Sequence, residues 1–228
     1  MSNKQTVFKR PSREIIIVFW KWVAIVLSMF LVTYLTANKL AAQNPNRYEM
    51  FMDWELSIPL VPWMIVVYLS YVGVFLLLPV IMKSGRSIIC LAYGFLTAIL
   101  VSTVVFVVFP GELGYHRPEF VAGFDFVFQM LYEVDKPHNL YPSLHVTFSS
   151  LTALGMAHQV KVQWFRVAIA GWAMMIAASV VLVHQHHVFD IITGLMLASF
   201  CFKYVYLKSM EKSGDTEFKK SFSADAIN

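Results

Sequence analysis

The sequence predicts an all-α integral membrane protein, a bundle of six transmembrane helices with one further helix on its outer face. Hydrophobic residues make up 58% of the 228 residues and charged residues only 14%, whereas soluble globular domains carry about 25% charged residues. Several apolar runs approach the roughly 20 residues that a helix needs to cross a bilayer. Basic residues are concentrated in alternate loops between these runs, as the positive-inside rule describes. These features exclude an ordinary soluble domain.

The predicted spans form two groups of three, with long apolar runs in the first group and shorter ones in the second. The fourth run contains His145 and four Ser or Thr side chains, which favours a helix that faces its neighbours rather than lipid. The two cysteines, Cys90 and Cys201, lie inside apolar runs and indicate neither a disulfide nor a metal framework. The six predicted spans are residues 15–36, 63–82, 88–109, 144–157, 167–183 and 191–207.

The distribution of Lys and Arg predicts that both termini lie in the cytoplasm. Thirteen of these residues fall in the two tails, in the even-numbered loops or, for Lys203, near the end of the sixth predicted span, against four in the opposite loops. Loops 37–62, 110–143 and 184–190 therefore face outward. The net charge of +4 is explained by this topology, so no nucleic-acid partner is expected. We expect one membrane domain (1–228), with a core (15–207) between cytoplasmic tails (1–14 and 208–228).

The outer loop 110–143 is long for a connection between bundle helices, which is often a sign of function. Its apolar residues recur at helical spacing and predict a short amphipathic helix on the outer face, between spans three and four. Two placements are equally compatible with this pattern: the membrane interface and the top of the bundle. The residues concerned are Phe120, Phe124, Phe128, Leu131 and Tyr132.

His186 and Asp190 are the first candidate catalytic pair. Their separation of four residues places them on one face if they share a helix, so that the carboxylate can accept a hydrogen bond from the ring. Such a bond leaves the other ring nitrogen as a free lone pair and stabilises positive charge on the ring. An imidazole prepared in this way can attack phosphorus. Alone, the spacing is also common in structural contexts.

Pro142-Ser143-Leu144-His145 is the second candidate element. Proline ends the preceding loop, and serine is a favoured N-cap for the helix that follows. The free amides of a helix N-terminus bind anions, so we expect Ser143 and Leu144 to contact a phosphate. His145, in the first turn, is then placed to protonate the oxygen that leaves phosphorus. An ordinary N-cap would explain the serine equally well.

Three further residues are candidates for contacts with the substrate. Arg117, beside Pro118 in the long outer loop, can bind phosphate oxygens with two parallel hydrogen bonds; a surface ion pair is the alternative. His187 neighbours His186 and is a candidate contact for a head group. His184 flanks the same stretch, and a direct chemical role is the less favoured interpretation for both of these histidines.

With these residues the chain resembles the type 2 phosphatidic acid phosphatase (PAP2) superfamily, which is defined by three motifs. Its members carry Lys-x6-Arg-Pro, then Pro-Ser-x-His, then Ser-Arg-x5-His-x3-Asp. The second motif is intact at Pro142–His145, and the third matches at Ser179, His186 and Asp190. The first keeps Arg117-Pro118. The resemblance covers residues 109–194 and implies that His186 is the nucleophile, Asp190 its partner, His145 the general acid, and Arg117 and Ser143 phosphate ligands.

Two basic residues of these motifs are missing. Pro110 stands at the lysine position of the first motif and Val180 at the arginine position of the third. The string His184-Gln-His-His-Val-Phe-Asp190 without that arginine resembles the inositol phosphorylceramide and sphingomyelin synthase branch. Enzymes of that branch transfer a phosphate-bearing head group to a lipid alcohol rather than to water. The resemblance therefore implies either a lipid phosphatase or a lipid phosphotransferase.

The expected activity is hydrolysis of a membrane lipid phosphate monoester or diphosphate through a phosphohistidine, with transfer to a lipid alcohol as the alternative. No cofactor or metal is expected, and the expected partners are the lipid substrate and the bilayer. Two rival interpretations remain: a non-catalytic lipid transporter, and a metal- or haem-binding protein that uses its clustered histidines. The string from Asp135 to His145 resembles bacterial members and predicts a bacterial inner-membrane protein with a periplasm-facing site.

Overall fold

The computed structural model describes residues 7–212, and every regular element in this range is helical. The predicted tails therefore lie partly outside the described residues, at 1–6 and 213–228. The two η elements are a 3-10 turn in the first outer loop and a π-helical stretch that continues α8. The elements are α1 (Arg13–Gln43), η1 (Asp53–Ser57), α2 (Met64–Leu76), α3 (Leu78–Ile81), α4 (Gly85–Val108), α5 (Asp125–Val134), α6 (Leu144–Gln159), α7 (Gln163–Leu182), α8 (Val188–Phe200) and η2 (Cys201–Leu207).

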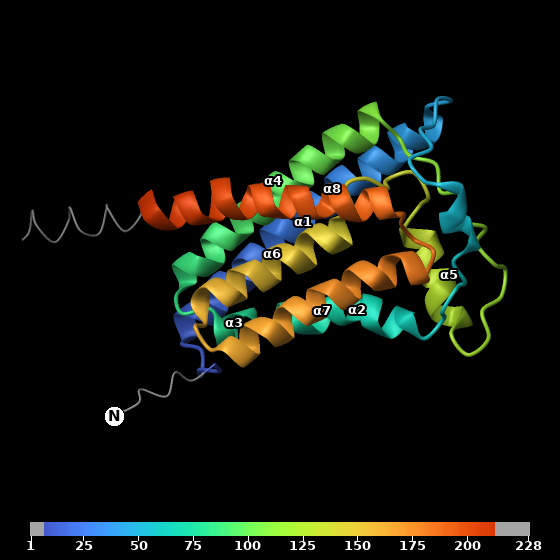
Figure 1. Cartoon of the computed structure of the whole chain (residues 1–228). Helices are drawn as coiled ribbons and strands as arrows, with labels where there is room; N and C mark the ends of the chain where they lie inside the picture. Colours follow the sequence, from blue (N-terminus) through green and yellow to red (C-terminus); the bar gives the residue numbers. More distant parts are fainter. Residues whose placement is uncertain (1–6, 213–228) are drawn as a thin grey trace, which may run out of the picture.

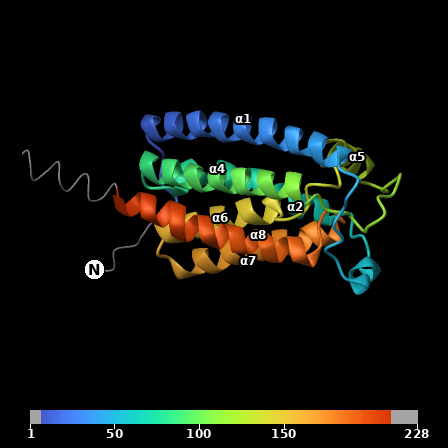
Figure 2. The same cartoon turned by 90° about the horizontal axis from the view of Figure 1, so that it is seen from above.

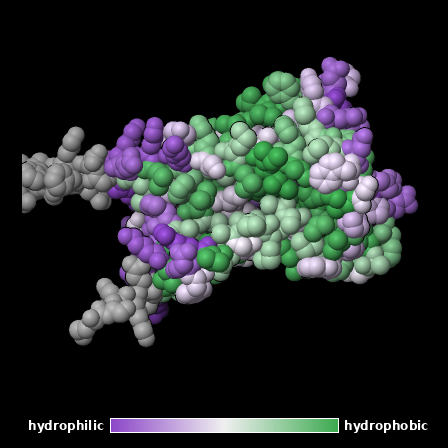
Figure 3. All heavy atoms as spheres, in the orientation of Figure 1, coloured by the Kyte–Doolittle hydropathy of each residue, from purple (hydrophilic) through white to green (hydrophobic). Residues whose placement is uncertain are grey.

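The long helices lie side by side and run along the bundle, as Figures 1 and 2 show. Helix α1 packs along α4, and α6 contacts α4, α7 and α8. Both ends of the described chain lie at one end of the bundle, whereas α5 and the outer loops lie at the other (Figure 1). On the face shown in Figure 3, hydrophilic residues gather at these two ends and hydrophobic residues cover most of the area between them. This distribution is that of a protein whose middle lies in lipid.

Four of the six predicted spans correspond to helices that are long and apolar enough to cross a membrane. They are Arg13–Gln43, Gly85–Val108, Gln163–Leu182 and Val188–Lys212. The second predicted span is divided into α2 and α3, because Pro79 has no amide proton to donate to the preceding turn. Helix α6, the fourth, has only 16 residues. The six-span topology therefore stays a prediction at these two segments.

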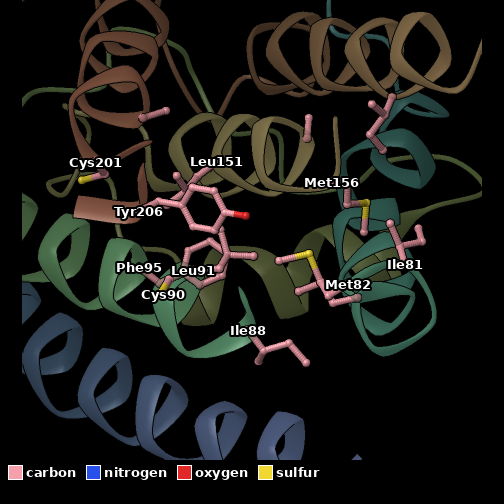
Figure 4. Close-up of a cluster of buried hydrophobic side chains, with 14 of the residues drawn as sticks. Ile81, Met82, Ile88, Cys90, Leu91, Phe95, Leu151, Met156, Cys201 and Tyr206 are labelled. Atoms are coloured by element: carbon pink, nitrogen blue, oxygen red, sulfur yellow. The ribbon is translucent and has the colours of Figure 1, made fainter. Parts of the chain in front are cut away.

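Helix α6 is the centre of the bundle and connects its two main apolar clusters. Leu151 and Met156 pack in the first cluster, which joins α1, α4, α6 and η2 and includes Phe95 and Tyr206 (Figure 4). Val146, at the other end of α6, packs in the second cluster with residues of α2, α5 and α7. The Ser and Thr side chains of α6 that made it look unlike a lipid-facing span are buried: Thr147, Ser149, Ser150 and Thr152.

The helix predicted in loop 110–143 exists as α5, with Phe128 fully buried in the second cluster. Its opposite side exposes Phe126, Met130 and Val134, which recur every four residues. Helix α5 thus has apolar residues on both faces, one of which packs on the bundle. A position at the membrane interface stays a prediction for the exposed face.

Candidate active site

The segment between α7 and α8 brings His186 to the end of the bundle at which α5 lies. Helix α7 ends in a double hydrogen-bonded turn: the His184 amide donates to the Val181 carbonyl at 2.9 Å and the Gln185 amide to the Val180 carbonyl at 3.0 Å. This Schellman arrangement needs a residue in the left-handed region after the helix, and His184 adopts it with φ of 55°. The conformation turns the chain sharply, so that His186 faces the interior and is only 3% exposed.

His186 and Asp190 contact each other, but in a different setting from the single helical face that the spacing predicted. Helix α8 begins only at Val188, so His186 precedes the helix and Asp190 lies in its first turn. One carboxylate oxygen, Oδ2, accepts from the His187 amide at 2.9 Å and lies 3.1 Å from His186 Nδ1. Because a carboxylate only accepts, Nδ1 carries the ring proton and Nε2 keeps its lone pair. The cap of the helix thus orients the imidazole.

Ser143 is the N-cap of α6, as predicted from its position. Its side chain accepts from the Val146 amide at 3.4 Å, and its own amide donates to the Asp190 carbonyl at 3.1 Å. The start of α6 is therefore bonded directly to the start of α8. Ser143 is completely buried, whereas its neighbour Leu144 lines the cavities described below.

The close approach of α6 and α8 depends on Gly194. A Cβ atom at this position would lie 2.9 Å from the Ser143 carbonyl oxygen, which is backbone and cannot rotate away. Thr147 Oγ1 donates to the Gly194 carbonyl at 3.1 Å across the same contact. Only glycine allows the two helices to meet at this distance.

His145 and His186 face a common cavity of about 440 Å³ that residues of α5 also line. The centroids of their rings are 6.1 Å apart. His145 Nδ1 lies 3.1 Å from the hydroxyl of Tyr68, so its Nε2 is the nitrogen left for other partners. A neighbouring cavity of about 310 Å³ lies among α1, α2, α4 and α6 and is almost entirely apolar; Phe30, Leu144 and His145 line both.

Asp135 is a site residue that the sequence motifs did not single out as functional. It follows α5, lines the same cavity, and accepts hydrogen bonds from Tyr34 and Tyr68. Asp135, His145 and His186 each offer a ligand atom, and these atoms lie within 4.8 Å of one another. These three side chains could converge on a divalent ion. In the sequence, Asp135 is marked only by its position shortly before the Pro-Ser-Leu-His motif.

Arg117 lies beside the segment that carries His186. Its Nη2 donates to Gln185 Oε1 at 3.0 Å, and its guanidinium stacks 4.7 Å from the centre of the Tyr132 ring. Burial lowers the pKa of Arg117, and the nearby Asp135 carboxylate opposes that change. Arg117 is thus held by a side-chain amide and an aromatic face close to the cavity.

His187 is placed away from the cavity, in a stack of rings. It lies between Phe51, with centroids 4.7 Å apart, and Tyr115 at 4.5 Å, and Tyr115 stacks on His184 at 4.1 Å. Its Nε2 accepts from the Gly114 amide at 3.2 Å. His187 is 1% exposed, so in this structure it contacts protein on all sides.

Glu55 is a second residue that the sequence reasoning missed. It comes from η1 and is completely buried. Its Oε1 accepts a hydrogen bond from the Met52 amide at 3.0 Å, and its Oε2 accepts one from the Val188 amide at 2.8 Å. The same Oε2 atom lies 3.4 Å from His187 Nδ1. A buried carboxylate in an outer loop thus caps the helix that follows His186. In the sequence, Glu55 is marked only as one of the acidic residues that lie among the aromatic residues of loop 37–62.

The two positions of the missing basic residues are buried. Val180 is 0% exposed and packs in the second apolar cluster with Met64, Ile65 and Phe128. Pro110 is buried too, and its carbonyl accepts from the Tyr48 amide at 3.0 Å. Neither residue lines either of the two cavities.

Comparison with known proteins identifies the class. The sequence model of the PAP2 superfamily matches residues 88–213, more than half of the chain, and the chain therefore belongs to the PAP2 superfamily. The match extends beyond the motif region at 109–194 on both sides. The chain is also similar to the uncharacterized protein MJ0662 of Methanocaldococcus jannaschii, with 28% identity over 123 residues. That alignment covers 54% of this chain and 48% of the relative, so the chain spans about half the length of that protein.

Proposed function

We propose that the protein is a membrane enzyme that cleaves a lipid phosphate through a covalent phosphohistidine. The observation that carries this proposal is the convergence of His186, backed by Asp190, and His145 on one cavity beside an apolar chamber. PAP2 membership supports phosphatase or phosphotransferase chemistry.

In the first step His186 Nε2 attacks phosphorus while His145 gives a proton to the departing oxygen. The P–O bond to the leaving group breaks as the N–P bond forms. In the second step His145 takes a proton from water or from a lipid alcohol, whose oxygen attacks phosphorus and releases His186. Asp190 stabilises the positive charge that develops on the His186 ring in the first step.

The phosphate oxygens need partners that are fixed before the reaction. We assign this function to Arg117 and to the amides of Leu144 and His145, the first two of α6. Ser143 supports them as the cap of that helix, since its side chain is occupied by the Val146 amide. The sequence suggested that His187 contacts the substrate. We assign it a structural function instead, because its ring is stacked between Phe51 and Tyr115.

A lipid substrate is supported by the apolar chamber of about 310 Å³ that adjoins His145. It lies among helices that carry exposed apolar side chains, so a hydrocarbon chain can enter from the bilayer while its phosphate reaches the histidines. By the charge distribution we place the site on the periplasmic side of a bacterial inner membrane, with cytoplasmic termini, in a single membrane domain of six spans.

Transfer to a lipid alcohol is the second candidate, and one observation favours it. Both positions at which lipid phosphatases of this superfamily usually carry cations, Pro110 and Val180, are buried and uncharged. The loss of a cation costs a doubly charged phosphate monoester more stabilisation than it costs a singly charged phosphodiester, because the Coulomb energy scales with the charge. A phosphodiester donor is the kind of substrate from which a head group is transferred.

The test is phosphate release from a panel of lipid phosphates in detergent, compared between the wild type and His186→Ala and with vanadate. We expect release that vanadate blocks and that the substitution abolishes. A parallel assay offers a phosphodiester lipid with a labelled head group and a lipid alcohol as acceptor. Absence of activity in both assays, with folded protein, contradicts the proposed function.

A further inference from the structure

Tyr68 connects a carboxylate to the imidazole of His145. Its side chain, from α2, is completely buried, and its hydroxyl lies 3.1 Å from His145 Nδ1 and 3.4 Å from Asp135 Oδ2. The Tyr68 and His145 rings are also in contact, with centroids 4.2 Å apart. Tyr34, from α1, donates to the other oxygen of Asp135.

The protons of this chain of groups can be assigned from their chemistry. The Asp135 carboxylate only accepts, and a phenol has a single proton to donate. When Tyr68 donates to Asp135 it accepts from His145, and the ring proton of His145 then lies on Nδ1. The Nε2 of His145 then has its lone pair free to take a proton, and it gives a proton when the ring is doubly protonated. The 3.4 Å step is longer than the usual O–H···O distance, so the chain is weaker than a direct carboxylate–histidine bond.

The two histidines of the site consequently have the same kind of support. Asp190 contacts His186 Nδ1 directly, and Asp135 reaches His145 Nδ1 through Tyr68. In both cases a carboxylate determines which ring nitrogen carries the proton and stabilises the protonated ring, as the triad aspartate does.

We propose that Tyr68 and Asp135 are positioning residues that orient His145 for proton transfer, and that Tyr34 holds Asp135 in place. Tyr34 and Tyr68 precede residue 88, where the superfamily match begins. The N-terminal helices α1 and α2 thus complete the site in addition to enclosing it. This inference rests on the proposed function of His145 as the general acid and base.

The test compares Tyr68→Phe and Asp135→Asn with the wild type, using kcat and KM on the best substrate found. We expect Tyr68→Phe to lower kcat by about 10- to 100-fold, a fraction of the effect of general acid–base catalysis, with KM changed less than about twofold. The double variant should be little slower than the slower single variant, because both substitutions interrupt one chain of hydrogen bonds.

Tyr206→Phe is the matched control. Tyr206 is also completely buried, and its hydroxyl lies 3.2 Å from a histidine nitrogen, His158 Nδ1, in the π-helical region far from the site. The Tyr206→Phe variant measures how the loss of a buried phenol hydroxyl alone affects the enzyme, because the substitution leaves the contacts of His145 unchanged. We expect kcat of this variant to stay at the wild-type value.

A second readout is independent of activity. The ¹⁵N chemical shifts of the His145 ring distinguish the Nδ1–H from the Nε2–H tautomer, and we expect Nδ1–H in the wild type and a mixture in Tyr68→Phe. Wild-type kcat and an unchanged tautomer in Tyr68→Phe overturn the inference. If the wild type cleaves no lipid, the proposed function fails, and the tautomer of His145 alone then decides whether the hydrogen-bonded chain exists.

Discussion

Glu55 accepts a hydrogen bond from the backbone amide of Val188, at 2.8 Å, and so connects the first outer loop to the helix that starts two residues after His186. The carboxylate has no exposed surface. A buried acceptor of this kind satisfies an amide at the helix N-terminus that would otherwise lack a partner, and its charge is favourable there. The loop thereby fixes the position of the candidate nucleophile.

We predict that Glu55→Ala lowers the free energy of unfolding by about 1–3 kcal/mol, the cost of leaving buried amides unsatisfied. It should also lower kcat, because the segment around His186 loses its anchor. Thermal unfolding in detergent and the activity assay measure the two effects. Asp53→Asn, an exposed change in the same 3-10 turn, is the control and should have no effect. Equal effects of the two substitutions would contradict the special position of Glu55.

The motif residues can be recognised in the sequence because their pattern is local. The capping serine, the two histidines and Asp190 are recognisable from spacing and from their place at the ends of apolar runs. Tyr34, Glu55, Tyr68 and Asp135 could not be found in this way, because their contacts join segments from 67 to 133 residues apart in the chain. Tyrosine in a hydrophobic helix has no pattern that separates a site residue from a packing residue.

The same distinction applies to the fold. Four spans could be predicted from composition and length, since lipid imposes both. The start of α8 could not be predicted, because it follows a turn in which His184 has a positive φ, a conformation that glycine usually adopts. A histidine there is stabilised by tertiary contacts, the stack on Tyr115 and a contact of Nε2 with the Ile58 carbonyl at 2.9 Å.

Gly194→Ala is predicted to separate α6 from α8. The new methyl group would lie 2.9 Å from the Ser143 carbonyl oxygen, so the helices must move apart and the geometry of His145 and His186 changes. We expect a loss of kcat of tenfold or more together with a lower unfolding temperature. Gly171→Ala, in α7 with open space around the added atom, is the matched control and should be neutral or stabilising by up to about 1 kcal/mol. A fully active Gly194→Ala enzyme would show that this contact is not needed.

Stability should fall in mild acid because of the stacked histidines. Burial lowers the pKa of His184 and of His187 from the ordinary value of about 6.5, although Asp190 and Glu55 oppose the change at His187. Below about pH 6.5 the unfolded chain therefore binds protons that the folded protein does not. The stabilisation is complete above that pH and is lost as the pH falls below it.

The measurement is thermal unfolding in detergent between pH 7.5 and 5.5, for the wild type and His184→Asn. Asparagine tolerates the left-handed conformation but does not titrate. We expect the variant to be less stable at pH 7.5 and to lose less stability on acidification than the wild type. Parallel curves for the two proteins would mean that His184 does not contribute to the pH dependence.

Val72→Trp is predicted to discriminate between lipid and soluble substrates. Val72 lines the apolar chamber from α2, so a larger side chain fills the volume proposed for a hydrocarbon chain. We expect KM for a long-chain lipid phosphate to rise several-fold, and KM for a short-chain soluble phosphate to stay unchanged. Val66→Trp, on the same helix, 63% exposed and outside the chamber, controls for the added ring. Equal changes for both substrates would place the hydrocarbon chain elsewhere.

Val180→Arg places an arginine where the superfamily motif has one, and we predict that it does not produce a better phosphatase. Val180 has no exposed surface and packs among apolar residues of α2 and α5. An unpaired buried cation there destabilises the protein, by several kcal/mol in comparable cases. Val180→Met, of similar length without charge, separates the effect of charge from that of size. A stable Val180→Arg variant with faster cleavage of phosphate monoesters would show that the cavity can accept the cation.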